Sequence, residues 1–284
     1  MLISDTLARS LVAGTPLLLA TAGEIYAERS GVLNLGVEGM MAVGAVAAFG
    51  TAASTGSPWL GLLAGAAAGT ALAAVHAFLC VSMKANQVVS GLALTMLGLG
   101  LSGVYGRSYV GMPLPCRFRH DPMLLLALLL SAGLGIVLFR TRWGIAVRSV
   151  GEHPGACEAA GVDVARVRYA CVLLGGAMAG MAGAQLSLVY VPSWIEGMTA
   201  GRGWIVIALT IFAGWNPWKA AVGAFLFGGI DISQYLLQSY LSPNILKMFP
   251  YAATLLALLA AGRSPHGADS PPAALALPYR KGER

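Results

Sequence analysis

The sequence predicts an all-α protein that crosses a membrane many times, and both its composition and its long apolar runs indicate this. Of the 284 residues, 57% are hydrophobic and only 11% are charged, whereas soluble domains carry about 25% charged residues. The stretch 59–83 contains no Asp, Glu, Lys or Arg. Because a bilayer core about 30 Å thick needs roughly 20 apolar residues per helix, this stretch alone is long enough to cross.

Further apolar runs follow along the chain, and several are shorter than a full crossing and contain glycine. In membrane proteins such segments often form broken or re-entrant helices that line a cavity. We therefore expect roughly eight to ten transmembrane or half-spanning helices within a transmembrane domain at 1–262. Asp5 precedes the first run, which we interpret as an uncleaved helix rather than a signal peptide. The candidate segments are 11–22, 40–53, 59–83, 87–105, 122–139, 169–191, 203–215, 220–237 and 248–262.

The arginines indicate which segments face the cytoplasm. Most of the net charge of +6 comes from basic residues around 140–168 and in the tail at 263–284, and the positive-inside rule places both in the cytoplasm. This explanation needs no nucleic-acid partner. The tail is rich in Pro, Ser and Ala, so we expect it to be disordered. The loop at 106–121 also carries arginines, and the orientation of the first half of the chain stays open.

Small residues recur at helical spacing in two of the apolar runs. Gly61, Gly65 and Gly69 share one helix face, as do Gly176 and Gly180. Because lipid gives little hydrophobic drive between helices, close backbone approach at such faces supplies the packing energy. We expect these faces to pack within the chain, with a partner subunit as the alternative.

The charged insert at 140–169 interrupts the membrane pattern. It is about five times longer than a simple connection between helices needs to be, and its "ACEAAGV" at 156–162 is able to form about two helical turns. The insert therefore predicts a cytoplasmic loop with a short helix that binds a partner, although a plain connector is the alternative.

Motifs for catalysis, nucleotide binding and metal binding are absent from the sequence. It contains no GxxxxGK[ST] phosphate loop, no HExxH and no GxSxG, and its four cysteines stand singly. Cys80 and Cys171 are interpreted as small packing residues. The chain is therefore predicted to be neither an enzyme nor a metal protein, and to have no cofactor of its own.

A sparse set of polar residues lies within or beside the apolar runs. A charged side chain at the bilayer centre costs at least about 2.5 to 3.5 kcal/mol, so such residues usually face a water-filled path or a partner. Some have simpler roles open to them, because Asn216 precedes Pro217 and fits a turn, while Glu28 and Arg29 fit an interfacial pair. We predict that the solute pathway includes Asn34, Glu38, Gln87, Ser90, Asn216 and Asp231.

Several blocks of the sequence together resemble one known family. They resemble, in this order, the permease subunits of bacterial ATP-binding cassette (ABC) importers, in the superfamily of branched-chain amino acid and ribose permeases and its branch for nucleosides and simple sugars. The likeness covers about residues 10–262. The blocks are "GEIYAERSGVLNLGVEGMM" at 23–41, "NQVVSGLAL" at 86–94, the whole insert at 140–169, "MTAGRGWIVIALTIFAGWNP" at 198–217 and "PY" at 250–251.

The resemblance implies partners and a location. Such permeases lie in the bacterial cytoplasmic (inner) membrane and pair with a second, homologous permease, here expected to form a heterodimer. A separate cytoplasmic ABC ATPase binds the ATP, and an extracytoplasmic lipoprotein binds the solute.

The resemblance also gives the charged insert a task, because the corresponding loop at 141–166 carries the helix that docks in the ATPase. This sequence departs from the common pattern, since Gly161 follows the "EAA" at 158–160 at once and His153 replaces the more usual Asn. The coupling positions that the resemblance implies are Gly151, Glu152, Pro154, Glu158, Ala159, Gly161 and Asp163.

Two glycine-rich stretches have a similar build. "SGVLNLGVEGMM" at 30–41 and "GMTAGRGWIVIAL" at 197–209 each place glycines ahead of an apolar run, and glycine lets a chain leave helical geometry and approach a ligand closely. We interpret the first as a broken element lining the path near the midplane, and the pair as counterparts in an internal inverted repeat. The alternative is that such entries are merely common in membrane helices.

The expected function is therefore translocation of a nucleoside or simple sugar by alternating access, driven by the separate ATPase. Two alternatives stay open. One is a branched-chain amino acid permease of the same class, although the polar set holds no obvious intramembrane cation for a carboxylate. The other is an ion-coupled secondary transporter in which Glu38 and Asp231 bind protons or sodium.

Overall fold

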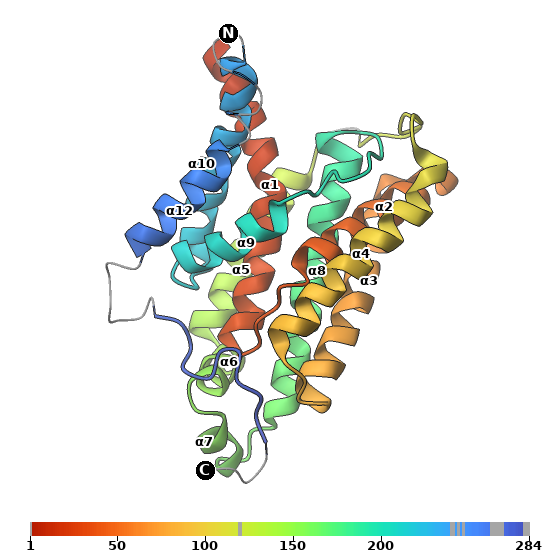
Figure 1. Ribbon diagram of the computed structural model, residues 1–284. Helices are drawn as coiled ribbons and strands as arrows, with labels where there is room; N and C mark the ends of the chain where they lie inside the picture. The colour runs from red at the N-terminus through yellow and green to blue at the C-terminus, as the bar shows by residue number, and fades with distance from the viewer. Residues whose placement is uncertain are drawn as a thin grey trace.

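The computed structural model describes residues 2–118, 121–238, 242, 245, 248–261 and 270–280. Every regular element in these residues is a helix (Figure 1), which confirms the prediction of an all-α fold. The elements are α1 (Leu2–Arg29), α2 (Val37–Thr55), α3 (Pro58–Ala77), η1 (Phe78–Ser82), α4 (Gln87–Gly106), η2 (Arg107–Tyr109), α5 (Met123–Arg140), α6 (Arg142–Glu152), α7 (Pro154–Ala159), α8 (Val164–Gln185), η3 (Leu186–Tyr190), α9 (Arg202–Phe212), α10 (Pro217–Leu237) and α12 (Phe249–Ala261).

Six helical segments of the described chain are long and apolar enough to cross a membrane. The short apolar helix α9 is a half-span, and α10 and α12 occupy the last two predicted segments, so the pattern agrees with the mixture of full and half spans expected from the sequence. The six segments are Asp5–Arg29, Val37–Thr55, Pro58–Ser82, Gln87–Tyr109, Met123–Arg140 and Val164–Tyr190.

The core of the molecule is built on close contacts between glycines of α2, α3 and α8. A side chain at Gly69 would overlap the carbonyl oxygen of Gly176, and one at Gly180 would overlap that of Gly65. The same face of α8 meets α2, where Gly180 lies against Gly44. Both small-residue faces therefore pack within the chain, as predicted, and the structure shows that they pack against each other.

The two arginine-rich segments lie at the same end of the molecule. α5 descends into α6 and α7, and the tail at 270–280 lies beside them, while the connection at 107–118 lies at the opposite end (Figure 1). This agrees with the positive-inside interpretation and places the 107–118 connection on the other side of the membrane.

Residues 270–280 of the tail are not disordered, and this corrects the expectation from composition. The backbone N–H of Ala274 donates to the carbonyl of Gly151 at 2.8 Å, and Ala274 is buried. The Tyr279 hydroxyl donates to Glu158. A Pro- and Ala-rich segment can order when a partner surface supplies hydrogen bonds and apolar contact, and α6 and α7 supply both. The rest of the predicted disordered tail, at 263–269 and 281–284, lies outside the described residues.

Candidate solute pathway and coupling surface

Two helices, α2 and α9, begin inside the molecule, and their N-termini meet at Glu38. α1 ends at Arg29 and the chain at 30–36 is not helical, so α2 starts only at Val37. The backbone N–H of Gly201, the residue before α9, donates to Glu38 Oε1 at 2.9 Å. A helix N-terminus favours negative charge, and the single carboxylate of Glu38 serves both helices.

Glycine makes this close approach achievable. Gly201 has φ +76°, a left-handed conformation that glycine adopts at little cost, and a side chain at Gly203 would overlap the Glu38 side chain. The helices in the two glycine-rich stretches therefore start at the same point of the molecule, beside Glu38. An inverted repeat would place its two broken elements in this way.

One oxygen of the Glu38 carboxylate has no hydrogen-bond donor among the described residues. Glu38 is 6% exposed, and its Oε2 has no hydrogen-bond partner among the described residues. A buried carboxylate oxygen without a donor is costly. This oxygen is closed off from solvent, so a solute reaches it only when α2 and α9 move apart.

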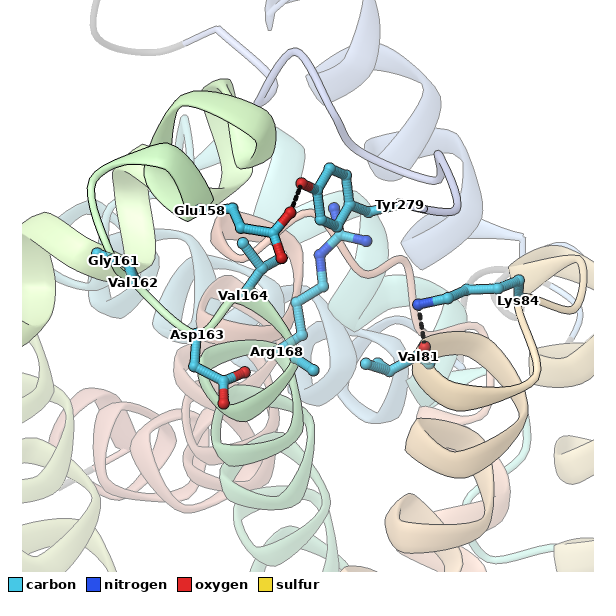
Figure 2. Close-up of a pocket in the computed structure, with 10 residues that line it drawn as sticks. Val81, Lys84, Glu158, Gly161, Val162, Asp163, Val164, Arg168 and Tyr279 are labelled. Atoms are coloured by element: carbon cyan, nitrogen blue, oxygen red, sulfur yellow. Dashed lines mark hydrogen bonds between the residues drawn. The ribbon is translucent and has the colours of Figure 1, made fainter. Parts of the chain in front are cut away.

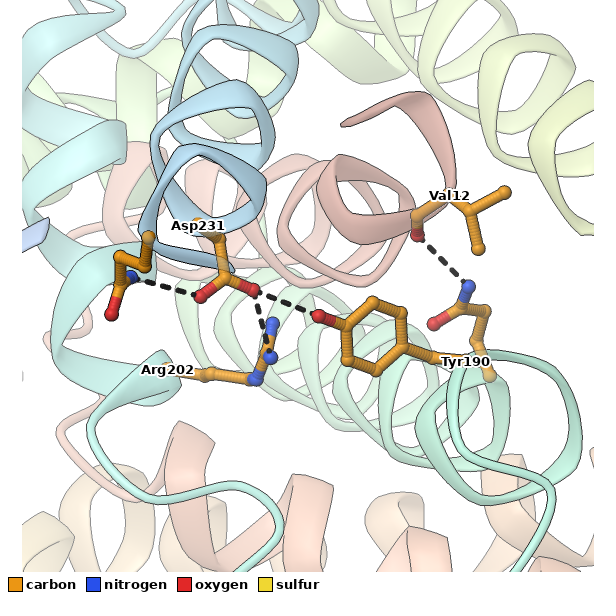
Figure 3. A network of polar contacts seen from close by, with 6 residues as sticks. Val12, Tyr190, Arg202 and Asp231 are labelled. Carbon is orange, nitrogen blue, oxygen red and sulfur yellow. Dashed lines mark hydrogen bonds and ion pairs between the residues drawn. The ribbon is translucent and has the colours of Figure 1, made fainter. Parts of the chain in front are cut away.

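Asp231 of α10 is the centre of a second polar group (Figure 3). Its Oδ2 accepts from Arg202 Nη2 at 3.2 Å and from the Tyr190 hydroxyl at 3.0 Å, and its Oδ1 accepts from Gln234 at 3.3 Å. The Arg202 guanidinium also lies 5.0 Å from the centre of the Tyr190 ring, within reach of a cation–π attraction.

Arg202 corrects the sequence-based statement that the polar set holds no cation. It is the first residue of α9, directly after Gly201 and so beside Glu38. Because Arg202 is paired with Asp231, its charge is already balanced, and a carboxylate ligand would have to displace Asp231 to gain it.

Asn34 holds the broken segment between α1 and α2 in place. Its Oδ1 accepts from the N–H of Gly36, and its side-chain amide donates to Glu24 Oε2 at 3.3 Å. Asn34 is fully buried. Backbone that leaves helical geometry inside a membrane protein needs such internal partners.

Gln87 and Ser90 act on the same break from α4. Gln87 Oε1 accepts from the N–H of Leu33 at 2.7 Å. The His76 ring bridges the Ser90 hydroxyl, at 3.0 Å, and the Leu33 carbonyl, at 3.1 Å. The structure thus brings Asn34, Gln87 and Ser90 together around one broken segment, whose far end leads to Glu38.

Asn216 lies apart from these groups. Its Oδ1 caps α10 by accepting from the N–H of Trp218 at 2.9 Å, which is the turn role that the sequence left open. The neighbouring Trp215 donates its indole N–H to Glu28 Oε2 at 2.5 Å.

Glu28 and Arg29 do not form the interfacial pair that the sequence suggested as an alternative. Arg29 instead donates to the carbonyls of Gly214 and Trp215, at 3.1 and 3.2 Å. Both side chains are buried. The last turn of α1 therefore grips the turn between α9 and α10, and Asn216 belongs to that turn.

A groove of about 670 Å³ runs along α6 and α7. It is largely apolar, and Ile145 on its wall is 56% exposed. Such a groove suits the insertion of an apolar surface from another protein. Its lining residues are Arg142, Ile145, Ala146, Arg148, Ser149, Glu152, His153, Ala156, Cys157, Ala160 and Val162.

The predicted coupling positions shape α6 and α7, which we call the coupling unit, and attach this unit to the rest of the molecule. Gly151 packs so tightly on the end of α1 that a side chain there would overlap the Arg29 carbonyl. Glu152 accepts from the N–H of Ala273 at 3.2 Å. The tail and the end of α1 therefore hold α6 from two directions.

The remaining coupling positions shape α7 and the start of α8. Pro154 begins α7 and Ala159 ends it. Gly161, with φ +84°, turns the chain after it, and Asp163 caps α8 by accepting from the N–H of Arg166 at 3.0 Å. Glu158 binds the tail through Tyr279.

These features fit a multi-pass membrane permease: broken helices meet at a buried carboxylate, and a largely apolar groove lies at one end. The comparison with protein families agrees. The family described as "Branched-chain amino acid transport system / permease component" matches residues 6–259, and the chain belongs to it.

Individual relatives are similar over most of their length. A putative glucose ABC transporter permease protein, TsgC13 of Haloferax volcanii, is 42% identical over 87% of this chain and 88% of its own length. The guanosine ABC transporter permease protein NupQ of Bacillus subtilis is 34% identical over 100% and 98%. The nucleoside ABC transporter permease protein NupC of Lactococcus lactis is 31% identical over 88% and 90%. No solved structure matched the chain.

The family establishes the chain as a transport subunit of an ABC transporter and not an enzyme. It is a multi-pass protein of the cytoplasmic membrane, with six apolar helices long enough to cross. Membership also implies association with a separate ATPase and with a solute-binding protein.

Proposed function

We propose that this permease translocates a nucleoside or a simple sugar as part of an importer. The carrying observation is that relatives similar over nearly the whole chain are named for glucose, guanosine and nucleosides. Such solutes offer hydroxyl and amide-like groups, which suit the spare oxygen of Glu38. Among the described residues, the cation beside Glu38 is Arg202, which is paired with Asp231. This pairing disfavours a carboxylate-bearing amino acid as the solute.

The pathway in this proposal passes the meeting point of α2 and α9. Glu38 contacts the solute directly, while the group around Asp231 holds the start of α9 against α10 and η3. Asn34, Gln87 and Ser90 keep the broken segment before α2 in shape. Separation of the two helix N-termini would open the path by alternating access, as expected of folds built from inverted repeats.

The partners follow from the other end of the molecule. A separate ABC ATPase binds the ATP, so this chain needs no cofactor. The ATPase docks on the groove along α6 and α7. A second, homologous permease completes the pathway as a heterodimer, and an extracytoplasmic lipoprotein delivers the solute.

Reconstitution tests the function. The chain, its second permease and the ATPase are placed in vesicles with the lipoprotein, and uptake of radiolabelled guanosine, glucose and leucine is measured with and without ATP. We expect ATP-dependent uptake of guanosine or glucose that survives an uncoupler. If leucine is taken up and guanosine and glucose are not, the chain belongs to the amino acid alternative. Uptake that needs no ATPase but depends on an imposed proton or sodium gradient would establish ion coupling.

Cysteine protection tests the docking groove. Ile145→Cys places a reactive thiol on the groove, and Ile195→Cys, at a residue 52% exposed near the other end, is the matched control. Burial raises the pKa of the Cys157 thiol, which also lines the groove, so we expect this native thiol to react slowly. We expect the ATPase to slow maleimide labelling at position 145 only. Equal labelling of position 145 with and without the ATPase would place the docking site elsewhere.

A further inference from the structure

A second cleft, of about 480 Å³, opens at the same end of the molecule as the groove along α6 and α7, which we call the coupling groove (Figure 2). It lies between the end of η1, the start of α8 and the tail, and Val162 is the one lining residue that it shares with the coupling groove. The docking of an ATPase on the groove does not account for it.

Two cations line this cleft. Lys84 follows the membrane-spanning segment that ends at Ser82, and its Nζ donates to the Val81 carbonyl at 2.5 Å. Arg168 is only 2% exposed. Its Nε and Nη1 donate to the carbonyls of Ser30 and Leu277, but its Nη2 has no partner among the described residues. This nitrogen is enclosed beside Gly31, so Arg168 acts on the cleft through its charge.

The positive charge around the cleft affects the pKa of Lys84. Burial lowers the pKa of Lys84, and the charges of Arg168 and Arg280 lower it further. A negative ligand between these groups would relieve the repulsion. The first residues of α8, Val164 and Ala165, also line the cleft, so the positive end of a long helix faces it.

The two acids at the cleft have donors of their own. Glu158 accepts from the Tyr279 hydroxyl. Asp163 caps α8 and forms an ion pair with Arg166 at 2.9 Å. Both acids are thus held at the α7 side, while Figure 2 shows Lys84 on the opposite wall.

We propose that this cleft binds a phosphate group between Lys84 and Arg168, supplied by the headgroup of an anionic phospholipid or by free phosphate. The position just past the end of a membrane-spanning segment is the depth at which headgroups lie, and basic residues there attract anionic lipids. The site is independent of the transported solute and of the proposed function.

Thermal unfolding of the purified full-length chain in detergent tests the site. The probes are short-chain phosphatidylglycerol, phosphatidylcholine as the zwitterionic control, and sodium phosphate. Lys84→Gln removes the charge and Lys84→Arg keeps it. Lys219→Gln is the matched control, because Lys219 is exposed at the start of α10 and does not line the cleft.

We expect phosphatidylglycerol, but not phosphatidylcholine, to raise the melting temperature of the wild type, Lys84→Arg and Lys219→Gln. Lys84→Gln should need roughly 5-fold more lipid for the same shift. A shift that sodium phosphate alone reproduces, with the same dependence on Lys84, also supports the site and identifies free phosphate as the source. Equal responses of Lys84→Gln and Lys219→Gln, or no response to either anion, would overturn the proposal.

Discussion

At the scale of single residues, Glu38 has the position that best fits contact with a solute. It is buried at the meeting point of two helix N-termini, and only one of its oxygens has a partner among the described residues. Its charge suits both helix ends and its free oxygen suits a polar solute.

Glu38→Gln tests the carboxylate. The glutamine can still accept from Gly201, so the fold and the assembly with the ATPase should survive, but the charge at the two helix ends is lost. We expect uptake to fall roughly 5- to 10-fold. Glu196→Gln, an exposed acid in the connection before α9, is the matched control and should transport normally. Unchanged uptake by Glu38→Gln would remove Glu38 from the pathway.

At the scale of elements, the helices are held by glycine contacts that leave no room for a side chain. Gly180→Leu should therefore separate α8 from α2 and α3, with a cost of at least about 1–3 kcal/mol from overpacking. The control is Gly100→Leu on α4, where an added Cβ meets nothing within 4 Å. Thermal unfolding in detergent measures both. A similar melting temperature for the two variants would contradict the packing described here.

The coupling unit offers a second pair of glycines. A side chain at Gly151 would overlap the Arg29 carbonyl, whereas one at Gly155 in α7 meets nothing within 4 Å. We expect Gly151→Ala to push α6 away from α1 and to lower uptake per ATP hydrolysed several-fold. Gly155→Ala should leave coupling intact, because the added Cβ has room there and alanine is favoured over glycine in a helix by about 1 kcal/mol. Equal coupling ratios for the two variants would show that α6 does not act through α1.

Sequence patterns predict these elements unevenly. Apolar runs predict most spans to within a few residues, and small residues at helical spacing predict which faces pack within the chain, because period and volume are local properties. They do not predict that the faces of α3 and α8 meet each other. The position of Arg202 beside Asp231 depends on a contact between segments 29 residues apart, which no local pattern encodes. For the tail, composition predicted disorder, but the surface that orders residues 270–280 lies more than 100 residues away.

At the scale of the whole molecule, a continuous line of contacts joins the proposed coupling surface to the proposed pathway. α6 packs through Gly151 on the end of α1. Glu28 and Arg29, at that end, hold the turn after α9, and the start of α9 meets Glu38. A displacement of α6 by a docked ATPase can reach Glu38 through α1 and α9 without passing through the lipid-facing helices. Contiguity alone does not prove coupling, so the line needs a test of its own.

Trp215→Phe provides that test. Phenylalanine keeps an aromatic ring at this position, but it removes the indole N–H that donates to Glu28 Oε2. The loss of a donor to a buried carboxylate should cost about 1–3 kcal/mol and loosen the grip of α1 on α9. We expect ATP hydrolysis by the assembled transporter to continue while uptake per ATP falls several-fold. Trp59→Phe, at a half-exposed tryptophan at the start of α3, should change neither. If uptake and hydrolysis fall together in Trp215→Phe, the contact supports stability only and the ATPase must move the pathway by another route.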